Sequence, residues 1–334
     1  MKIVNSMLDL IGNIPLVRLN RIGKETGCEI LVKPEFLNPS GSIKDRMALV
    51  LIETAEREGK LKPGMRIVEG STGNTATSLA FVAAVKGYEL TVHVPKRVAN
   101  PQRLAIQKVY GKDVEIVDTD AMGETTELVL TEEEKETVRS SGAIHGNLIE
   151  YHPRAICRRK ERENPDVWWS RQHSNPANVA CHRDWTAKEI LEATGGTLDG
   201  FVASIGTGGT LMGVGEALSK AVPGVHIIGV EPAGTPLTAG QTKEDLARRG
   251  RFEGILISIF DAEFIEEVWT VTDAEAIEMT HLLAEQEGMF CGVSSGANVV
   301  ACLRLAKQLG PGKRIVTVLP DSRDRYLDVE QYTT

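Results

Sequence analysis

Apolar and polar residues change their spacing repeatedly along this chain. From residue 29 onward, short β-branched runs are followed by stretches in which apolar residues recur at helical spacing. This alternation is typical of parallel strands joined by crossover helices, and it predicts an α/β fold. We expect strands at residues 29–33, 66–69, 89–94, 114–117, 201–204, 226–230 and 314–318.

Three predicted helices begin directly after a turn or a strand. Ser42 is a suitable N-cap for the first, whose apolar residues recur at helical spacing until Gly59, so Lys44 lies in its first turn. The second helix begins near Asn74 and the third near Thr210, after a cluster of glycines. The second and third helices each start right after a strand.

The segment between the fourth and fifth predicted strands departs from this pattern. Residues 131–139 form a charged helical stretch and residues 158–164 a run of charges, which is most often a solvated face. Trp168 and Trp169 follow closely, and burial of indole rings is a large hydrophobic gain. We therefore expect a docked cap here rather than a disordered linker.

Composition narrows the class of protein. With 334 residues, 42% of them hydrophobic and 25% charged, two domains are favoured over one. The net charge of -8 argues against nucleic acid as a partner, because counterion release requires clustered Lys and Arg. The sequence contains no signal segment and no long apolar stretch, which predicts a soluble cytoplasmic protein that does not bind a membrane.

The five cysteines are widely scattered, so we expect reduced thiols rather than a disulfide framework. Two cysteines and two histidines could form a metal-binding set, but their spacing matches no structural zinc pattern: Cys157, His173, Cys181 and His182. We therefore expect no metal site.

The densest local signal is a cluster that follows a predicted strand and opens a helix, namely Gly206, Thr207, Gly208, Gly209 and Thr210. Glycines let the backbone approach an anion, and a helix N-terminus adds N–H groups and partial positive charge, so the cluster indicates a phosphate site. A tight turn without a ligand is the alternative. The cluster lacks the ending of a P-loop, whereas Glu231, at the end of the next strand, keeps dinucleotide binding as a minor alternative.

Lys44 belongs to a second signal, the turn of residues 38–46. Taken alone, a solvated lysine at a helix start is the ordinary explanation. A desolvated ammonium, however, readily loses its proton, and the free amine can then attack an aldehyde and later carry a proton. Residues 71–75 offer donors that suit a carboxylate, and residues 292–298 place two hydroxyls at a helix start, of which N-capping would explain one.

Together these motifs resemble one family, the cysteine synthases and cystathionine β-synthases. The resemblance covers nearly the whole chain, is weak only from residue 118 to 171, and rests on motifs in the family's order at residues 15–17, 38–46, 71–75, 175–178, 206–210, 292–297, 319–322 and 325–327. It implies a fold type II pyridoxal-phosphate enzyme, similar to the tryptophan synthase β-subunit, with parallel-rich sheets covered by helices. It further implies a smaller, mobile substrate-carboxylate domain at residues 41–151, a larger cofactor-phosphate domain at residues 1–40 plus 152–334, and a homodimer.

Carried over by position, the resemblance implies a role for each motif. Lys44 would hold pyridoxal 5'-phosphate as a Schiff base and act as the catalytic base, and Gly206, Thr207, Gly208, Gly209 and Thr210 would bind the cofactor phosphate. Asn74 would contact the ring hydroxyl, and Ser294 would face the pyridine nitrogen. The substrate carboxylate would be bound by Ser71, Thr72, Asn74, Thr75 and Gln172.

The reaction implied is β-replacement on an activated L-serine, either O-acetylserine or O-phosphoserine. It would pass through an α-aminoacrylate and give cysteine or another β-substituted alanine, as in a transferase or lyase of amino-acid biosynthesis. The partners would thus be an amino-acid substrate and a nucleophile. Three alternatives remain within this chemistry: condensation of the cystathionine β-synthase type, diaminopropionate-type synthesis with an amine nucleophile, and simple β-elimination. A catalytically silent homologue is an alternative of another class.

Two departures from the family pattern bear on the substrate. Residues 254–261 replace two family glycines with bulkier side chains, which puts sulfide in doubt as the nucleophile. His173 stands where the family commonly has an aromatic residue, and Arg171 precedes Gln172, so an additional charge near the substrate is expected. We also expect residues 118–171, with Arg154, Arg158 and Arg159, to cap the site and adjust specificity.

Overall fold

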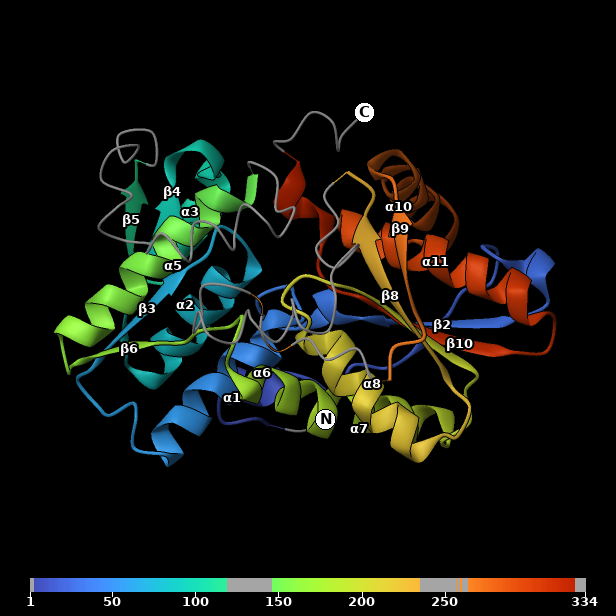
Figure 1. The fold of residues 1–334 in the computed structure, drawn as a ribbon, viewed down its shortest axis with the longest axis horizontal. Helices are drawn as coiled ribbons and strands as arrows, with labels where there is room; N and C mark the ends of the chain where they lie inside the picture. Colours follow the sequence, from blue (N-terminus) through green and yellow to red (C-terminus); the bar gives the residue numbers. More distant parts are fainter. Residues whose placement is uncertain (1–2, 119–145, 235–256, 258, 260–263, 328–334) are drawn as a thin grey trace. The chain divides into compact units, whose positions relative to one another are not determined.

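A computed structural model describes residues 3–118, 146–234, 257, 259 and 264–327 (Figure 1). The chain divides into two compact units. The first unit comprises Met1–Asp9, Lys44–Asn178 and Gly240–Ile259, and the second comprises Leu10–Ile43, Val179–Ala239 and Phe260–Thr334. Each unit contains its own largely parallel sheet, so the α/β class predicted from the sequence is confirmed.

The described part of the first unit is a four-stranded parallel sheet in the order β5-β4-β3-β6. Its strands are β3 (Arg66–Gly70), β4 (Glu89–Pro95), β5 (Asp113–Val117) and β6 (Val167–Trp169). The helices of this unit are α1 (Lys44–Arg57), α2 (Asn74–Lys86), α3 (Pro101–Val109) and α5 (Gly146–Glu163). Helix α5 packs along β3 and β4, whereas α2 packs against β4 and α1 (Figure 1).

Local chemistry explains the helix ends in this unit. The Asn100 side chain accepts a hydrogen bond of 3.0 Å from the N–H of Arg103, and Pro101 occupies the first position of α3, where a missing N–H costs nothing. Gly87 ends α2 in the left-handed conformation with φ 81°. At the end of β3, a Cβ on Gly70 would lie 2.8 Å from the backbone nitrogen of Arg154, so only glycine allows α5 to approach this closely.

The described part of the second unit is a six-stranded sheet in the order β1-β2-β10-β7-β8-β9. Strand β1 (Val17–Arg18) runs antiparallel to β2 (Glu29–Pro34), and the other pairs are parallel: β10 (Arg314–Leu319), β7 (Gly200–Ser204), β8 (His226–Pro232) and β9 (Glu267–Val271). The helices are α7 (Ala187–Thr194), α8 (Gly209–Ala221), α10 (Asp273–Glu287) and α11 (Val293–Leu309). Helix α6 (Pro176–Cys181) and a π-helical turn (His182–Thr186) precede α7.

The core of the second unit lies between this sheet and α10 and α11. Side chains of β2, β7, β8 and β10 pack there against apolar residues of the two helices, among them Val32, Val202, Ile228, Leu283, Val299, Leu305 and Ile315. The strands are buried on both faces, which explains their near-continuous apolar runs. Burial of this apolar surface is the main stabilising contribution to the unit.

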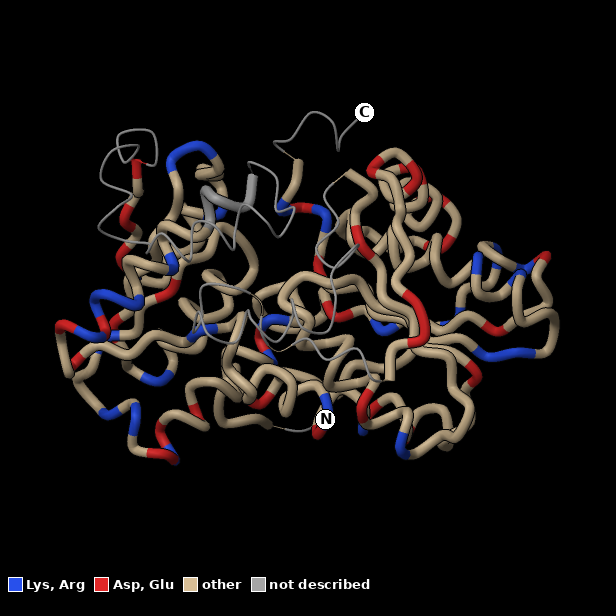
Figure 2. Tube along the Cα trace, viewed as in Figure 1, with Lys and Arg blue, Asp and Glu red and all other residues tan. Residues whose placement is uncertain are grey.

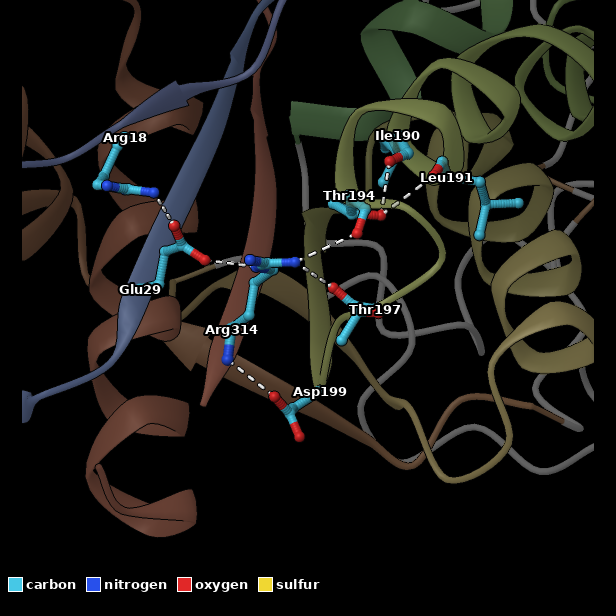
Figure 3. A network of polar contacts seen from close by, with 8 residues as sticks. All are labelled: Arg18, Glu29, Ile190, Leu191, Thr194, Thr197, Asp199 and Arg314. Atoms are coloured by element: carbon cyan, nitrogen blue, oxygen red, sulfur yellow. Dashed lines mark hydrogen bonds and ion pairs between the residues drawn. The ribbon is translucent and has the colours of Figure 1, made fainter. Parts of the chain in front are cut away.

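A polar network joins the amino ends of three strands in the second unit (Figure 3). The Arg314 guanidinium bonds to Glu29 and donates to the carbonyls of Thr194 at 3.2 Å and Thr197 at 2.9 Å. The N–H of Arg314 donates to Asp199 at 2.8 Å, and Glu29 also pairs with Arg18. The network therefore holds β2, β10 and the start of β7 in register at their amino ends.

Charges of both signs are interspersed over both units rather than gathered in one stripe (Figure 2). Within the part of the chain that the structure describes, no helix has both the length and the apolar character to cross a bilayer. No three His, Cys, Asp or Glu side chains among the described residues gather as a metal would require.

Most local predictions agree with the structure. Each predicted strand is present, with ends that differ by no more than two residues. The N-cap prediction is wrong by one residue, because α1 begins at Lys44 and Ser42 instead forms an isolated bridge with Asp321. Residues 131–139 lie outside the described residues.

The sequence suggested that Trp168 and Trp169 belong to a docked cap, and this is wrong. They belong to β6, which pairs with β3 and is buried. The physical reason is that indole burial indicates packing without specifying a strand or a helix. Residues up to Trp169 thus pair with the first unit, beyond the predicted boundary at 151, whereas the roles assigned to the two domains stay predictions.

Candidate active site

The predicted carboxylate-binding segments meet in the first unit. Residues 71–75 follow β3 directly, and Asn74 is the first residue of α2. The hydroxyl of Thr75 donates a hydrogen bond of 2.5 Å to Oε1 of Gln172, which lies 97 residues further along the chain. The backbone N–H of Gly73 donates to the Ser71 hydroxyl at 3.3 Å, and Arg103 donates to the Thr72 carbonyl at 3.3 Å. The structure therefore brings Gln172 to the start of α2, where helix N–H groups favour an anion.

A tight turn holds Gln172 in place. Arg171 has φ 52°, and its carbonyl accepts hydrogen bonds from the N–H groups of Ser174 and Asn175. The Asn178 side chain donates to the Gln172 carbonyl at 2.8 Å. Because the carbonyls of Arg171 and Gln172 both accept hydrogen bonds, the Gln172 side chain starts from a fixed backbone.

The buried carboxylate of Glu69 holds Ser170, the residue just before this turn. The Ser170 hydroxyl donates to Glu69, and the N–H of Gly70 donates to the same carboxylate at 2.8 Å. Burial raises the pKa of the Glu69 carboxyl, although Ser170, Arg154 and the Gly70 N–H each act to lower it. The role of Glu69 was missed in the sequence, where its only signal is an acidic residue within an apolar strand.

Lys44 is half-buried and opens α1. The turn before it is fixed in the second unit, because the N–H of Ile43 donates to the Pro320 carbonyl at 2.8 Å, just beyond β10. Gly41 in this turn has φ 83°, and a Cβ there would meet the Arg325 guanidinium at 3.0 Å. Glycine is therefore favoured at this position by its left-handed conformation, whereas the Arg325 side chain could move aside.

The glycine cluster lies at the carboxyl end of β7 in the second unit. Gly208 has φ 89°, α8 starts at Gly209, and no heavy atom of the described residues lies within 4 Å of a Cβ placed on Gly206. The N–H of Gly209 is 3.3 Å from the Thr207 hydroxyl, and the Thr210 hydroxyl is 3.3 Å from Nε2 of His182. Open space beside Gly206 and the N-terminus of a helix together suit a phosphate group.

Ser294 is the second residue of α11 and is half-buried. The N–H of Gly292 donates to the Asp321 carbonyl at 3.0 Å, which ties the start of α11 to the chain just beyond β10. Strands β10 and β7 are neighbours, so Ser294 and the glycine cluster lie at the same edge of one sheet. A ligand at the carboxyl edge of an open α/β sheet is the usual arrangement.

Arg171 was expected to place an additional charge near the substrate, and this stays a prediction. It forms an ion pair with Glu161, and its Cζ lies 5.4 Å from the centre of the Trp169 ring. Its charge is thus engaged within the first unit. Residues 254–261, expected to change the nucleophile site, lie outside the described residues except for positions 257 and 259.

Comparison with known proteins agrees with this geometry. A family model described as pyridoxal-phosphate dependent enzyme matches residues 7–321. A cysteine synthase from Staphylococcus aureus (strain Mu50 / ATCC 700699) is 37% identical, over 99% of this chain and 98% of that protein. A cystathionine beta-synthase from Oryctolagus cuniculus is 34% identical, over 98% of this chain and 56% of that protein.

Solved structures share the fold. The crystal structure of an O-ureido-L-serine synthase aligns with a TM-score of 0.81 and 32% identity, covering 99% of this chain and 96% of that one. A cysteine synthase (OASS) from Entamoeba histolytica aligns with a TM-score of 0.81 and 30% identity, covering 100% and 92%. The fold is therefore shared along nearly the whole chain.

Proposed function

Because this chain belongs to the family of pyridoxal-phosphate dependent enzymes, we propose that it catalyses β-replacement on an activated L-serine. The donor is O-acetyl-L-serine or O-phospho-L-serine, and the product is cysteine or another β-substituted alanine. The observation that carries the proposal is the hydrogen bond between Thr75 and Gln172, which joins the two segments expected to hold the amino-acid carboxylate. The similarity to cysteine synthases over nearly the whole chain supports the same reaction class.

The described residues fit the cofactor. Gly206 leaves open space at a helix N-terminus, which suits the phosphate, and we assign Gly206, Thr207, Gly208, Gly209 and Thr210 to it. We assign Asn74 to the ring hydroxyl, Ser294 to the pyridine nitrogen and Lys44 to covalent attachment. When bound, pyridoxal phosphate supplies an electron sink for negative charge that develops at the substrate Cα.

The side chains of this protein then divide the remaining work. Lys44 removes the proton from Cα, which requires its amine to be neutral at that moment. Ser71, Thr72, Asn74, Thr75 and Gln172 bind and orient the carboxylate through hydroxyl, amide and backbone donors. A serine hydroxyl at the pyridine nitrogen does not hold a proton there as a carboxylate would, and this favours loss of the β-group over transamination.

A second candidate is the same chemistry with a thiol or an amine as the nucleophile. It is favoured by residues 254–261, which are bulkier than the glycine-containing family segment. The relationship to a cystathionine beta-synthase supports keeping this candidate.

One experiment tests both candidates. The purified protein is loaded with pyridoxal phosphate and offered each serine donor with sulfide, homocysteine and small amines, and products are identified by mass spectrometry. We expect one nucleophile to dominate. Release of pyruvate alone with every nucleophile would instead establish simple β-elimination.

Lys44→Ala tests the assignment of the lysine. We expect loss of the visible absorption of the lysine-bound cofactor and a fall in turnover of about 10³-fold, because both attachment and proton transfer are removed. Retention of that absorption in the variant would refute the role of Lys44. Lys60→Ala, an exposed lysine of the same unit, is the matched control.

We also propose that the protein is a homodimer located in the cytosol. Exposed apolar side chains such as Ile3 and Met7 support association through the N-terminal segment. Light scattering should give about twice the chain mass of 36.4 kDa. Fractionation of cells that express the tagged protein would test its location.

A further inference from the structure

His182 is a fully buried histidine of the second unit that the proposed function does not use. It is the first residue of the π-helical turn before α7, and in the sequence it stood out only as one of four scattered candidates for a metal ligand. Its ring lies between two threonines: Nδ1 is 2.9 Å from the Thr186 hydroxyl, and Nε2 is 3.3 Å from the Thr210 hydroxyl. Thr210 belongs to the glycine cluster assigned to the cofactor phosphate, so His182 contacts a residue that is expected to bind the cofactor.

Close packing fixes the position of His182 against α8. A Cβ on Gly213 would lie 2.6 Å from the Arg183 nitrogen and 2.8 Å from the His182 Cβ. Only glycine at this position of α8 therefore lets the π-helical turn approach so closely. Thr210 lies about one turn before Gly213 on the same face of the helix, so backbone positions set the contact between His182 and Thr210.

The hydroxyl of Thr186 determines which ring nitrogen of His182 carries the proton. Thr186 is fully buried, and Nδ1 of His182 is the one hydrogen-bond partner that its hydroxyl has among the described residues. A buried O–H needs an acceptor, and Nδ1 accepts only when it carries no proton. If Nδ1 donated instead, the proton of Thr186 would be left without a partner in the protein interior. The imidazole is therefore neutral, with its proton on Nε2.

This tautomer sets the direction of the hydrogen bond to Thr210. The Nε2–H of His182 donates to the Thr210 oxygen, so the proton of Thr210 is not used in this contact. With the opposite tautomer, Thr210 would donate to Nε2 and present only lone pairs to an anion. Thr210 is half-buried in the first turn of α8, where the helix N–H groups favour the same anion. The Thr210 O–H is thus left to donate to a ligand at this helix N-terminus.

We propose that His182 is a positioning residue for the cofactor phosphate and that it acts through Thr210. Thr186 donates to His182, His182 donates to Thr210, and Thr210 donates to a phosphate oxygen. The inference rests on the proposed function, because it takes the glycine cluster as the phosphate site. A hydrogen bond to a charged oxygen contributes more than one between neutral groups, so reversal of this chain of donors weakens cofactor binding.

Two variants that differ by one methylene group test the chain of donors. His182→Gln places an amide N–H near the position of Nε2, whereas His182→Asn places it near Nδ1, out of reach of Thr210. Absorbance titration of the full-length protein gives the dissociation constants of pyridoxal phosphate and of pyridoxal, which lacks the phosphate. We expect His182→Asn to weaken binding of pyridoxal phosphate about ten-fold and His182→Gln to stay within about three-fold of the unsubstituted protein. Neither variant should change the affinity for pyridoxal by more than about two-fold.

Thr210→Val removes the hydroxyl and keeps the shape of the side chain. In that background His182→Asn should cause no further loss of affinity for pyridoxal phosphate, because His182 acts through a hydroxyl that is already absent. A further loss of about ten-fold, or an equal loss of affinity for pyridoxal, would overturn the inference. His182 would then support the fold and not the phosphate.

Nitrogen NMR of the cofactor-loaded protein tests the tautomer directly. With all seven histidines isotopically labelled, the signals that disappear in His182→Gln belong to His182. We expect a protonated Nε2 and an unprotonated Nδ1, and the reverse pattern would contradict the inference. His226→Asn is the matched control in the titrations, because His226 begins β8 and bonds to Glu266 rather than to the glycine cluster. It should bind pyridoxal phosphate normally.

Failure of this inference is distinguishable from failure of the proposed function. If the His182 variants bind pyridoxal phosphate as expected but the unsubstituted protein turns over no serine donor, β-replacement fails and the role of His182 stands. If serine donors are turned over but His182→Asn and His182→Gln bind pyridoxal phosphate alike, β-replacement stands and the role of His182 is refuted.

Discussion

The two edges of the six-stranded sheet have opposite chemistry. At the amino edge, Arg314 bonds to a carboxylate and two carbonyls, and its N–H donates to Asp199. At the carboxyl edge, the glycine cluster and Ser294 place backbone and hydroxyl groups at helix N-termini, where they suit a ligand. The Arg314 network and the proposed ligand-binding groups thus lie at opposite edges, and we expect each to be alterable without the other.

The first unit repeats the contrast on a smaller sheet. At its amino edge, the Arg66 guanidinium bonds to Thr91 at 2.8 Å and to Asp113 at 2.5 Å, which joins β3, β4 and β5. At its carboxyl edge, residues 71–75 lead into α2. The same division in two separate sheets indicates that it follows from parallel topology, since helix N-termini face the carboxyl ends of the strands that precede them.

Arg314→Met should remove the guanidinium bonds at the amino edge of the second unit and leave the carboxyl edge unchanged. We expect the free energy of unfolding to fall by about 2 kcal/mol, because two carbonyls and Glu29 lose a charged donor that is largely shielded from water. Urea denaturation measures this change. The dissociation constant of the cofactor should not move, and a large increase would contradict the separation of the edges.

Arg18→Met is the control for that experiment. Arg18 pairs with the same Glu29, but its side chain is 64% exposed. Exposed ion pairs contribute little, so we expect a change below about 0.5 kcal/mol.

His93 tests the strand interior, away from either edge. Burial and Lys160 lower the pKa of His93 from 6.5 to about 4, although Glu115, 3.1 Å away, raises it in part. The unfolded chain therefore binds more protons between these pH values, and stability is lost as the pH falls from 6.5 towards 4. We expect this group to make the free energy of unfolding about 1–2 kcal/mol lower at pH 5 than at pH 7. His93→Gln should remove that part of the pH dependence.

Chemical denaturation at both pH values measures the effect. Other groups also titrate in this range, so the quantity to compare is the difference between His93→Gln and the unsubstituted protein. An identical pH dependence in the two would show that His93 is accessible to protons in the folded state.

Gly208→Ala should weaken cofactor binding at the carboxyl edge. We expect its effect to be smaller than those of Arg314→Met and His93→Gln. A φ of 89° is strained for alanine by about 1 kcal/mol, and relaxation would turn the N–H groups away from the phosphate. We expect cofactor affinity to fall about five-fold, measured by absorbance titration. Gly224→Ala, at a φ of 81° outside the cluster, should carry the same strain and leave cofactor affinity unchanged.

The fold was largely predictable because most strands are short apolar runs, each of which can be recognised in the sequence independently of the others. The glycine cluster and residues 71–75 were also located correctly between a strand and a helix, since glycines and hydroxyl residues mark such junctions locally. β6 was missed because a strand of three residues leaves no periodicity to detect.

The surroundings of His173 could not be derived from the sequence. Arg171 is the nearer arginine along the chain, yet it forms an ion pair with Glu161. The charge of Arg154, in the middle of α5, lowers the pKa of His173 instead. That exchange depends on the left-handed conformation at Arg171 and on the packing of α5 against β3. Both are tertiary features, which spacing along the chain does not encode.

Gly70 limits how this protein can change over generations. A Cβ at this position would lie 2.8 Å from the Arg154 nitrogen and 2.9 Å from the Pro153 carbonyl carbon, so backbone rather than a flexible side chain blocks every other amino acid. We therefore expect no other amino acid at position 70 to be tolerated, either in natural variants or in engineered ones. Variation near this edge of the sheet must therefore enter through side chains such as that of Arg154, and not through a shift of the α5 backbone that Gly70 allows to approach β3.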